Sequence, residues 1–344
     1  MSAPGIGATA VLAALRAQTG TALSGETLSA TLGVSRAQVW KHVSALRKRG
    51  YGIEGEPGGG YRLAALPDRL YAEEVQHGLS TQWLAQTYEH FDEIDSTNRV
   101  AFDRGREGAP AGSVIVAESQ SAGRGRLGRQ FFSPPHQNLY ASILLRPAGS
   151  IADTPTLILG AAVAVAETVA EFIGDESAIE IKWPNDVLIR RRKTSGILME
   201  SSTEGTRIAF AVLGIGINLN VDRETFPDDF RQHATSLSSE LGAPVDRIAF
   251  TRTLFERLET QLDAHARGGF DAVRPRFESF FRMAGEPIGV EEIGGQRIDG
   301  IALGIAPGGA LEVEIGEGPR RGEIVQVMAG DVTLAKPAPN PQYS

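Results

Sequence analysis

Residues Ala122–Arg129 read AGRGRLGR, a stretch in which three arginines alternate with three glycines. Glycine lets the backbone approach an anion closely, and each arginine offers planar, bidentate donors to a carboxylate or a phosphate. The segment from 119 to 152 contains no acidic residue, although the 344-residue chain has a net charge of −8. The stretch therefore predicts an anion-binding loop, around which the rest of the chain is organised.

Two common glycine-rich patterns fit this stretch only in part. Gly123, Gly125 and Gly128 match G-x-G-x-x-G, but the paired prolines that follow block the helix that a dinucleotide site requires, and no acid stands about 20 residues on. Arg129 and Gln130 occupy the positions where a phosphate-binding P-loop has Lys and Ser/Thr. Both patterns are rejected, which leaves a solvated basic loop in a nucleic-acid-binding protein as the alternative to a ligand loop.

The length and composition predict two or three domains in a reducing environment. The hydrophobic content of 42% is typical of globular proteins, and the absence of cysteine excludes disulfides, thiolate metal sites and a cysteine nucleophile. The N-terminus lacks the pattern of a signal peptide. The most apolar run, 157–173, is interrupted by Glu167 and Glu171 and is shorter than the roughly 20 residues of a membrane span. We expect it to be a buried helix, and we expect a cytoplasmic protein with no membrane partner.

The first 65 residues form a separate basic module. They carry seven Lys and Arg against three Asp and Glu, a net charge of +4, so the remainder carries 27 against 39, or −12. Ser24 and Ser35 are placed to cap two helices, the first ending at Gly33 and the second running over 36–49. The β-like pieces around the glycine-rich turn at 57–60 complete a winged helix-turn-helix.

The second helix of this motif is the predicted DNA-reading element. Val39, Val43 and Leu46 stand at helical spacing on one face, so the opposite face would enter a major groove. A plain protein-protein module is the alternative reading of such a unit. The predicted DNA-binding residues are Ser35, Arg36, Gln38, Lys41, His42 and Arg47, with Lys48 as a further phosphate contact.

The rest of the chain predicts an α+β protein with mixed strands and helices. We expect strands at 88–94, 113–118, 139–145, 179–182, 187–189, 196–200 and 207–220, and helices at 97–106, 154–173, 248–266 and 270–281. Short β segments separated by glycine-rich turns then predict a small β-barrel. The predicted domains are 1–66, 67–285 and 286–336, with a disordered tail at 337–344.

Five blocks, in order, resemble the biotin protein ligases that double as biotin-operon repressors. They are DSTN at 95–98, ESQSAGRGRLGR at 118–129, KWPND at 182–186, RKTSGILME at 192–200 and GIGINLN at 214–220, behind an N-terminal module that resembles the family's winged helix. The resemblance covers nearly the whole chain. It implies a class II synthetase-like ligase domain, an SH3-like C-terminal barrel, and operator DNA and a biotin carboxyl carrier domain as partners.

The resemblance also implies a two-step reaction and the residues that carry it. Biotin and MgATP would give biotinyl-5′-AMP and pyrophosphate, and a carrier lysine would then attack the mixed anhydride. Two anions must meet in the first step, so positioning and fixed cations are the largest requirement. The implied catalytic residues are Arg126 and Lys193; the implied biotin-binding residues are Ser96, Thr97, Asn98, Gln120, Arg124, Gly125, Arg126 and Lys193. The implied nucleotide-binding residues are Arg129, Phe131, Lys182, Asn185, Asp186 and Asn218, with Asp186 as the candidate contact for Mg²⁺.

Some positions depart from the family pattern, and two other functions remain open. Leu127 stands where relatives often have a basic or polar residue, and the C-terminal segment lacks the arginine that some relatives direct at ATP. This departure casts doubt on a contribution of the C-terminal domain to the site. The alternatives are a sensor of biotin or its adenylate without ligase activity, and a ligase for lipoate. The resemblance also implies a homodimer promoted by the adenylate.

Overall fold

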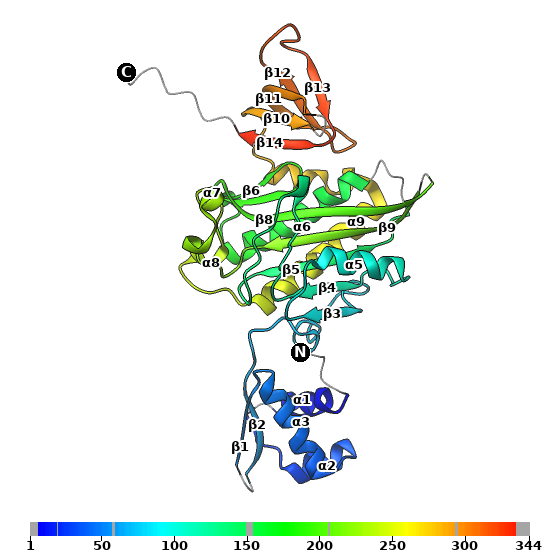
Figure 1. Ribbon diagram of the computed structural model, residues 1–344, viewed down its shortest axis with the longest axis vertical. Helices are drawn as coiled ribbons and strands as arrows, with labels where there is room; N and C mark the ends of the chain where they lie inside the picture. Colours follow the sequence, from blue (N-terminus) through cyan, green and yellow to red (C-terminus); the bar gives the residue numbers. More distant parts are fainter. Residues whose placement is uncertain are drawn as a thin grey trace.

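The computed structural model describes residues 6–18, 20–56, 59–148, 154–205, 207–292 and 295–334. Three parts follow one another along the long axis of the molecule: a helical module with a hairpin, a central body of sheet and helices, and a small sheet (Figure 1). The predicted α+β class is confirmed. The tail at 337–344, predicted to be disordered, lies outside the described residues.

The N-terminal module is the predicted winged helix-turn-helix. Its elements are α1 (Ile6–Ala17), α2 (Gly25–Leu32), α3 (Arg36–Lys48), β1 (Gly52–Glu56) and β2 (Gly60–Ala65). The Ser24 side chain accepts a hydrogen bond from the Thr27 backbone N–H at the start of α2, and Gly33 ends that helix with a φ of 64°. Val39 and Val43 are fully buried in the module's core, as predicted.

The central body is built on one mixed sheet. Within the described residues it has seven strands in the order β3-β4-β5-β9-β8-β7-β6, with β3 and β4 parallel and the other pairs antiparallel. The strands are β3 (Tyr88–Phe91), β4 (Val114–Ala117), β5 (Leu139–Leu145), β6 (Ile179–Lys182), β7 (Asp186–Ile189), β8 (Arg192–Glu204) and β9 (Arg207–Ile217). All seven predicted strands are present, most with bounds shifted by one to four residues.

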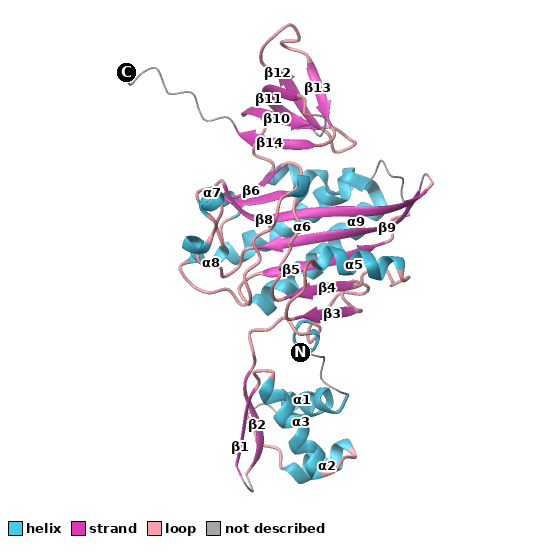
Figure 2. Ribbon diagram, in the orientation of Figure 1, coloured by secondary structure: helices cyan, strands magenta, loops and turns pink. Residues whose placement is uncertain are grey.

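Successive residues along each strand face opposite sides of the sheet. In β9, Leu213 and Ile215 join the large core under α6 (Thr154–Ile173) and α9 (Arg247–Phe280), whereas Phe210 and Val212 face the opposite side, where α5 (Thr97–Arg106) packs. Figure 2 shows the two long helices behind the sheet and α5 in front of it. The face that carries α5 is the one that continues into the cleft described below.

The long helices differ from the sequence prediction in two ways. The two helices predicted at 248–266 and 270–281 form one element, α9, interrupted at Gly268 and Gly269, whose backbone angles are non-helical. In α6, residues Pro155–Ile173 are long and apolar enough to span a membrane by length and composition, so the length argument against a span was wrong. Of that stretch, 72% is buried inside the protein, in keeping with the predicted core helix.

The C-terminal strands form a twisted sheet rather than a closed barrel. The strands are β10 (Pro287–Glu292), β11 (Arg297–Ile305), β12 (Leu311–Ile315), β13 (Ile324–Val327) and β14 (Gly330–Leu334), in the order β13-β12-β11-β10-β14. Among the described residues, no ladder joins the edge strands β13 and β14. The predicted strands are confirmed, but the predicted closure is not.

The junctions between the three parts are packed. Tyr71, predicted in the second domain, lies in the core of the winged module, and core residues of β10 to β14 belong to the same cluster as those of the central sheet. The short helix α4 (Ala72–Val75) carries Glu73 and Glu74, which accept hydrogen bonds from Arg49 and Arg16 of the winged module. The exact domain limits stay a prediction.

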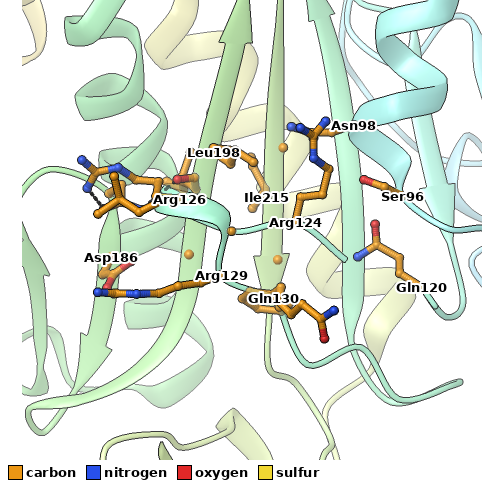
Figure 3. A pocket seen from close by; sticks show the side chains of 18 of the residues that line it. Ser96, Asn98, Gln120, Arg124, Arg126, Arg129, Gln130, Asp186, Leu198 and Ile215 are labelled. Atoms are coloured by element: carbon orange, nitrogen blue, oxygen red, sulfur yellow. Dashed lines mark hydrogen bonds between the residues drawn. The ribbon is translucent and has the colours of Figure 1, made fainter. Parts of the chain in front are cut away.

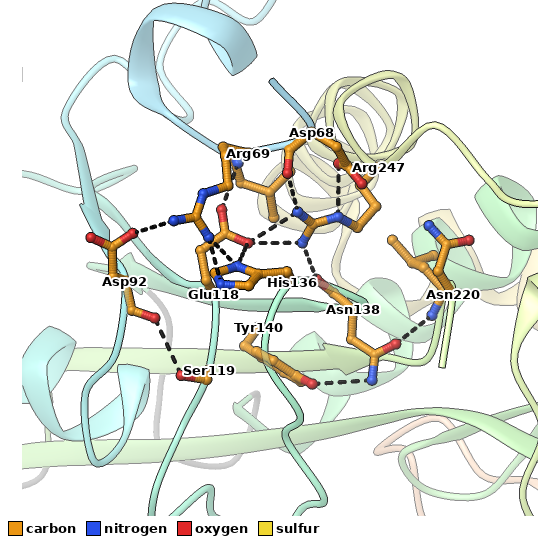
Figure 4. A network of polar contacts seen from close by, with 12 residues as sticks. Asp68, Arg69, Asp92, Glu118, Ser119, His136, Asn138, Tyr140, Asn220 and Arg247 are labelled. Carbon is orange, nitrogen blue, oxygen red and sulfur yellow. Dashed lines mark hydrogen bonds and ion pairs between the residues drawn. The ribbon is translucent and has the colours of Figure 1, made fainter. Parts of the chain in front are cut away.

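A buried ion pair lies where this junction meets the central body. Arg247 of α9 donates to Glu118 at 3.0 Å, and both side chains are fully buried (Figure 4). Arg247 also donates to Asp68, and the Leu70 backbone N–H donates to Glu118 at 2.8 Å. Glu118 follows β4 and stands just ahead of the glycine-arginine loop, so one buried pair holds the domain linker, α9 and the start of that loop.

Candidate functional site

A cleft of about 800 Å³, open to solvent, lies on the α5 face of the central sheet. The N-terminus of α5, the glycine-arginine loop at 122–129, and strands β7, β8 and β9 surround it. Its lining residues are Ser96, Thr97, Asn98, Gln120, Arg124, Gly125, Arg126, Leu127, Arg129, Gln130, Phe131, Asn185, Asp186, Lys193, Gly196, Ile197, Leu198, Gly214, Ile215, Gly216 and Asp331. Figure 3 shows Arg126, Arg129 and Asp186 at one end of the cleft and Ser96, Asn98 and Gln120 at the other.

Glycines on the cleft face of the sheet make the room for this site. A Cβ at Gly214 would stand 2.0 Å from the Oδ1 atom of Asn98, and one at Gly216 would stand 2.6 Å from the ring of Phe131. Both glycines continue the face that carries Phe210 and Val212 further back in β9. The GIGIN pattern thus places isoleucines toward the core and glycines under the cleft.

Each basic side chain of the cleft has a partner within the protein. The Arg124 guanidinium lies 3.0 Å from the Glu200 carboxylate, and the Lys193 ammonium lies 2.7 Å from that of Asp186. Arg129 pairs with Asp331 of β14. A bound anion would therefore have to displace the carboxylates that already neutralise these cations.

Arg126 is the most enclosed of the loop arginines. It donates to the Asn185 side-chain oxygen at 2.9 Å and to the Gly330 backbone carbonyl at 3.0 Å. Burial, the largest influence, lowers the pKa of Arg126, although the guanidinium stays charged at neutral pH because its ordinary pKa is above ~12. Gly330 and Asp331 belong to the C-terminal sheet, so this sheet contacts the cleft, through a backbone carbonyl and a carboxylate rather than through the arginine of some relatives.

The far end of the cleft is polar and largely uncharged. The Thr97 backbone N–H donates to Gln120 Oε1 at 2.8 Å, and Gln120 Nε2 donates to Ser133 Oγ at 3.1 Å. The Ser96 hydroxyl is buried and has no hydrogen-bond partner within the described protein. An unpaired buried hydroxyl at the start of α5 suits a polar ligand group.

Most of the residues predicted for the site meet in this one cleft. All of the predicted biotin-binding side chains line it, together with Arg129, Phe131, Asn185 and Asp186. Lys182 and Asn218 do not line it: Lys182 stands opposite Asp186 in the β6–β7 ladder, and the Asn218 amide donates to the Thr235 backbone carbonyl.

The sequence reasoning missed Glu200 and Asp331, the two carboxylates that pair with loop arginines. Glu200 ends the RKTSGILME block, but neither that block nor the residues around Asp331 indicate that these carboxylates pair with loop arginines. Each pair joins residues that are far apart in the sequence, which local patterns do not show.

The candidate metal contact is Asp186, whose neighbours fit a phosphate-bound Mg²⁺. No group of three or more His, Cys, Asp and Glu in the described part of the chain could hold a metal by itself. Mg²⁺ commonly binds through one or two carboxylates together with substrate phosphates and water. Asp186 beside Asn185 at the cationic end of the cleft matches that mode.

The recognition helix α3 is a second candidate site. Ser35 and Gln38 form a capping box in which Gln38 Oε1 accepts from the Ser35 backbone N–H at 2.8 Å, so only the Gln38 amide NH₂ is left for a base. Arg36 and Lys41 are exposed, as predicted. Trp40, which the sequence reasoning did not select, is 61% exposed on the same helix. Trp40 therefore shares this helix with the exposed Arg36 and Lys41.

Two predicted DNA contacts are partly engaged elsewhere. His42 is half-buried, and its ring lies 2.4 Å from where a Cβ would stand on Gly7, so it packs against α1 rather than pointing outward. Arg47 donates to the Ile53 backbone carbonyl at 2.8 Å and braces the wing. The side chains of Arg36, Trp40 and Lys41 are the more available part of this face.

Comparisons with known proteins match both regions of the chain that carry a candidate site. Residues 90–218 match the biotin/lipoate A/B protein ligase family, and residues 8–62 match a helix-turn-helix domain. The chain is 36% identical to the bifunctional ligase/repressor BirA of Bacillus subtilis over 91% of this chain and 94% of that protein. It is 33% identical to the BirA of Escherichia coli over 90% of this chain and 92% of that one.

A solved structure gives the same result for the fold. The biotin protein ligase of Aquifex aeolicus in complex with biotin and ATP matches with a TM-score of 0.61 and 28% identity, covering 73% of this chain and all of that one. The cleft, the helix-turn-helix module and the similarity over nearly the full chain lead to one assignment. The chain belongs to the biotin/lipoate A/B protein ligase family, in the form that carries an N-terminal helix-turn-helix domain.

Proposed function

We propose that this protein is an ATP-dependent biotin–protein ligase that also acts as a biotin-responsive DNA-binding repressor. The observation that carries the ligase is the cleft itself, in which Arg124, Arg126 and Lys193 stand beside a polar pocket formed by Ser96, Thr97 and Gln120. Fixed cations answer the main physical obstacle, which is bringing a carboxylate against an α-phosphate.

In the first step, a carboxylate oxygen of biotin attacks the α-phosphorus of ATP, and the bond to the β-phosphate oxygen breaks to release pyrophosphate. Lys193 and Arg126 are the proposed catalytic residues, because each places a positive group at the end of the cleft where these anions would meet: Arg126 lies near Asp186 there (Figure 3), and the Lys193 ammonium lies 2.7 Å from the Asp186 carboxylate. Mg²⁺ enters with ATP as part of the substrate and screens the phosphate charge, with Asp186 as its proposed protein contact. In the second step, a lysine amine of a biotin carboxyl carrier domain attacks the acyl carbon, and AMP leaves.

The polar end of the cleft favours biotin over lipoate. The ureido ring of biotin offers two N–H donors and a carbonyl, whereas the dithiolane ring of lipoate offers no strong hydrogen bonds. Ser96 has an unpaired buried hydroxyl there, and Thr97 and Gln120 add polar groups. A lipoate site built from these residues would leave buried polar groups unsatisfied, which is costly.

A pyrophosphate-exchange assay distinguishes biotin from lipoate as the substrate and also tests the alternative of a sensor without ligase activity. The protein is incubated with ATP, labelled pyrophosphate and either biotin or lipoate, and label incorporated into ATP is measured. We expect exchange with biotin and little with lipoate. Faster exchange with lipoate would show that lipoate is the substrate. No exchange with either acid would rule out the ligase activity.

The repressor part of the proposal rests on the basic winged module. Its recognition helix exposes Arg36, Trp40 and Lys41, and the relatives that match over the full chain are named as repressors. We propose that the adenylate promotes a homodimer that presents two recognition helices to a two-fold operator. Gel-shift assays with biotin and ATP added together or left out test this coupling, because binding that ignores the ligands would argue against it.

A further inference from the structure

Glu200 of β8 lies at the end of a chain of hydrogen bonds that runs into the polar end of the cleft. Asn98 Nδ2 donates to Glu200 Oε2 at 3.0 Å, and Asn98 Oδ1 lies 2.6 Å from Ser142 Oγ. Ser142 Oγ in turn lies 2.8 Å from Thr97 Oγ1. Asn98 and Thr97 are each 4% exposed and Ser142 is fully buried, so water does not interrupt this chain.

The charge of Glu200 fixes which atoms donate at Asn98 and at Ser142. A carboxylate only accepts, so the Asn98 group that faces it must be the NH₂, and the Asn98 oxygen must face Ser142. The single proton of the Ser142 hydroxyl must then go to Asn98 Oδ1. Ser142 therefore has no proton left for Thr97, whose own hydroxyl proton can go to Ser142 Oγ at 2.8 Å or to Gln120 Oε1 at 3.1 Å.

Thr97 is left as a pure acceptor toward the cleft. Its one proton is used within the protein, on Ser142 Oγ or on Gln120 Oε1, and Gln120 Oε1 also accepts from the Thr97 backbone N–H at 2.8 Å. The lone pairs of Thr97 Oγ1 that this chain of hydrogen bonds does not use can then accept a hydrogen bond from a ligand. Only an N–H or O–H group of a ligand satisfies such an atom.

We propose that Glu200 is a positioning residue that makes Thr97 an obligate acceptor for a ureido N–H of biotin, an inference that rests on the proposed biotin ligase function. Gly214 belongs to the same arrangement, because any Cβ there would collide with Asn98 Oδ1 and force the amide to move. A neutral amide at position 200 would remove the constraint, since it could donate or accept. Asn98 could then flip, Ser142 could donate to Thr97, and the acceptor would be partly occupied.

The test is Glu200→Gln, which keeps the size of the side chain and changes only its charge and donor pattern. We expect KM for biotin to rise about tenfold, as for the loss of one well-placed hydrogen bond. KM for ATP and kcat should change less than about twofold, which also shows that the variant is folded. The control is Glu204→Gln, an exposed glutamate at the end of the same strand, which should behave as the parent protein.

A double-mutant comparison separates this route from the ion pair between Glu200 and Arg124. If Glu200 acts through Asn98, then Glu200→Gln should add nothing further to KM for biotin in an Asn98→Ala background. An equal rise in both backgrounds, or no rise in the parent, would overturn the inference while leaving the ligase function intact. Absence of biotin transfer by the parent protein would instead refute the proposed function, and the inference with it.

Discussion

Arg129 of the glycine-arginine loop pairs with Asp331 of β14, a residue 202 positions further along the chain. Although burial raises the pKa of Asp331, the hydrogen bond and charge of Arg129 more than offset this effect, and the pKa lies below its usual range. Asp331 is therefore an anion at neutral pH. In the proposed reaction it competes with the phosphates of ATP for Arg129.

Asp331→Asn should remove this competitor. The Arg129 side chain is 66% exposed, so the pair is in the class worth about 0.2–1 kcal/mol. We expect KM for ATP to fall by roughly 1.5- to 5-fold, measured by pyrophosphate release under saturating biotin. Asp299→Asn, which breaks an exposed pair within the same small sheet, should have no such effect. A rise in KM for ATP would mean that Asp331 helps to hold the nucleotide.

Arg126→Ala should shorten the retention of the adenylate. Arg126 is enclosed between Asn185 and Gly330, where a charge-assisted hydrogen bond to the ligand is worth about 1.5–3 kcal/mol. The release rate of labelled adenylate from the purified complex should rise roughly 10- to 100-fold. The exposed Arg320, replaced in the same way, serves as the control. A release rate equal to that of the parent protein would exclude the proposed role.

The loop should close over the ligand and become resistant to protease. Leu127 is 55% exposed, so the tip of the loop is open to solvent. We expect tryptic cleavage after Arg124 or Arg126 to slow in the presence of biotin and ATP, because closed lids shield their backbone. Cleavage at the exposed turn of Arg320 should continue at the same rate, and an unchanged pattern at both sites would contradict the lid.

Lys41→Ala should weaken DNA binding and leave ligation unchanged. Lys41 is exposed on α3, and the N-terminal module that carries α3 lies at one end of the molecule, apart from the strands β8 and β9 that line the cleft (Figure 1). As a phosphate contact it should lower operator affinity uniformly across sequences and reduce the salt dependence of binding by about one unit of slope. Parallel gel-shift and biotinylation assays on one preparation check this. A Lys41→Ala protein that cannot transfer biotin would contradict the division of labour.

The buried pair of Glu118 and Arg247 should control acid stability. Burial raises the pKa of Glu118, but the hydrogen bond with His90 and the charge of Arg247 outweigh this effect. Together they lower the pKa from 4.5 to about 2. Because the folded-state pKa is the lower one, the ionised carboxylate stabilises the protein above about pH 4.5. This stabilisation, on the order of 3 kcal/mol, is lost as the pH falls toward about 2.

Glu118→Gln should remove that pH dependence and destabilise the protein at neutral pH. Arg247 would be left buried without its counter-charge, a change that typically costs about 3–5 kcal/mol. Urea unfolding at pH 7 and at about pH 2.5 measures both effects, because most of the stabilisation is lost only near the folded-state pKa. The control is Glu54→Gln, which breaks an exposed pair with Arg62 and should cost less than about 1 kcal/mol. Equal costs for the two variants would show that the buried pair has no special role.

The features that the sequence predicted well are local. Ser24, Gly33 and Ser35 mark helix ends because caps satisfy backbone groups within a few residues, and the structure confirms all three. The alternation of glycine and isoleucine in GIGIN likewise depends only on the two-residue period of a strand. Family blocks then brought most of the predicted cleft residues together.

The features that it missed depend on pairing across long distances. The partners of Arg124 and Arg129 lie in β8 and β14, and nothing near either arginine indicates them. The position of His42 depends on Gly7, whose missing side chain admits the imidazole ring. Closure of the C-terminal barrel could not be judged from strand spacing, because closure requires the edge strands to pair and spacing does not encode which strands pair.

Transfer of biotin to a carrier tests the central claim most directly. The purified protein is incubated with biotin, ATP, Mg²⁺ and an apo biotin carboxyl carrier domain, and the carrier is analysed by mass spectrometry with and without each substrate. We predict that one lysine of the carrier gains biotin, only when biotin and ATP are both present, and that Lys193→Gln slows the gain strongly. An unmodified carrier in the complete reaction with the parent protein would contradict the account.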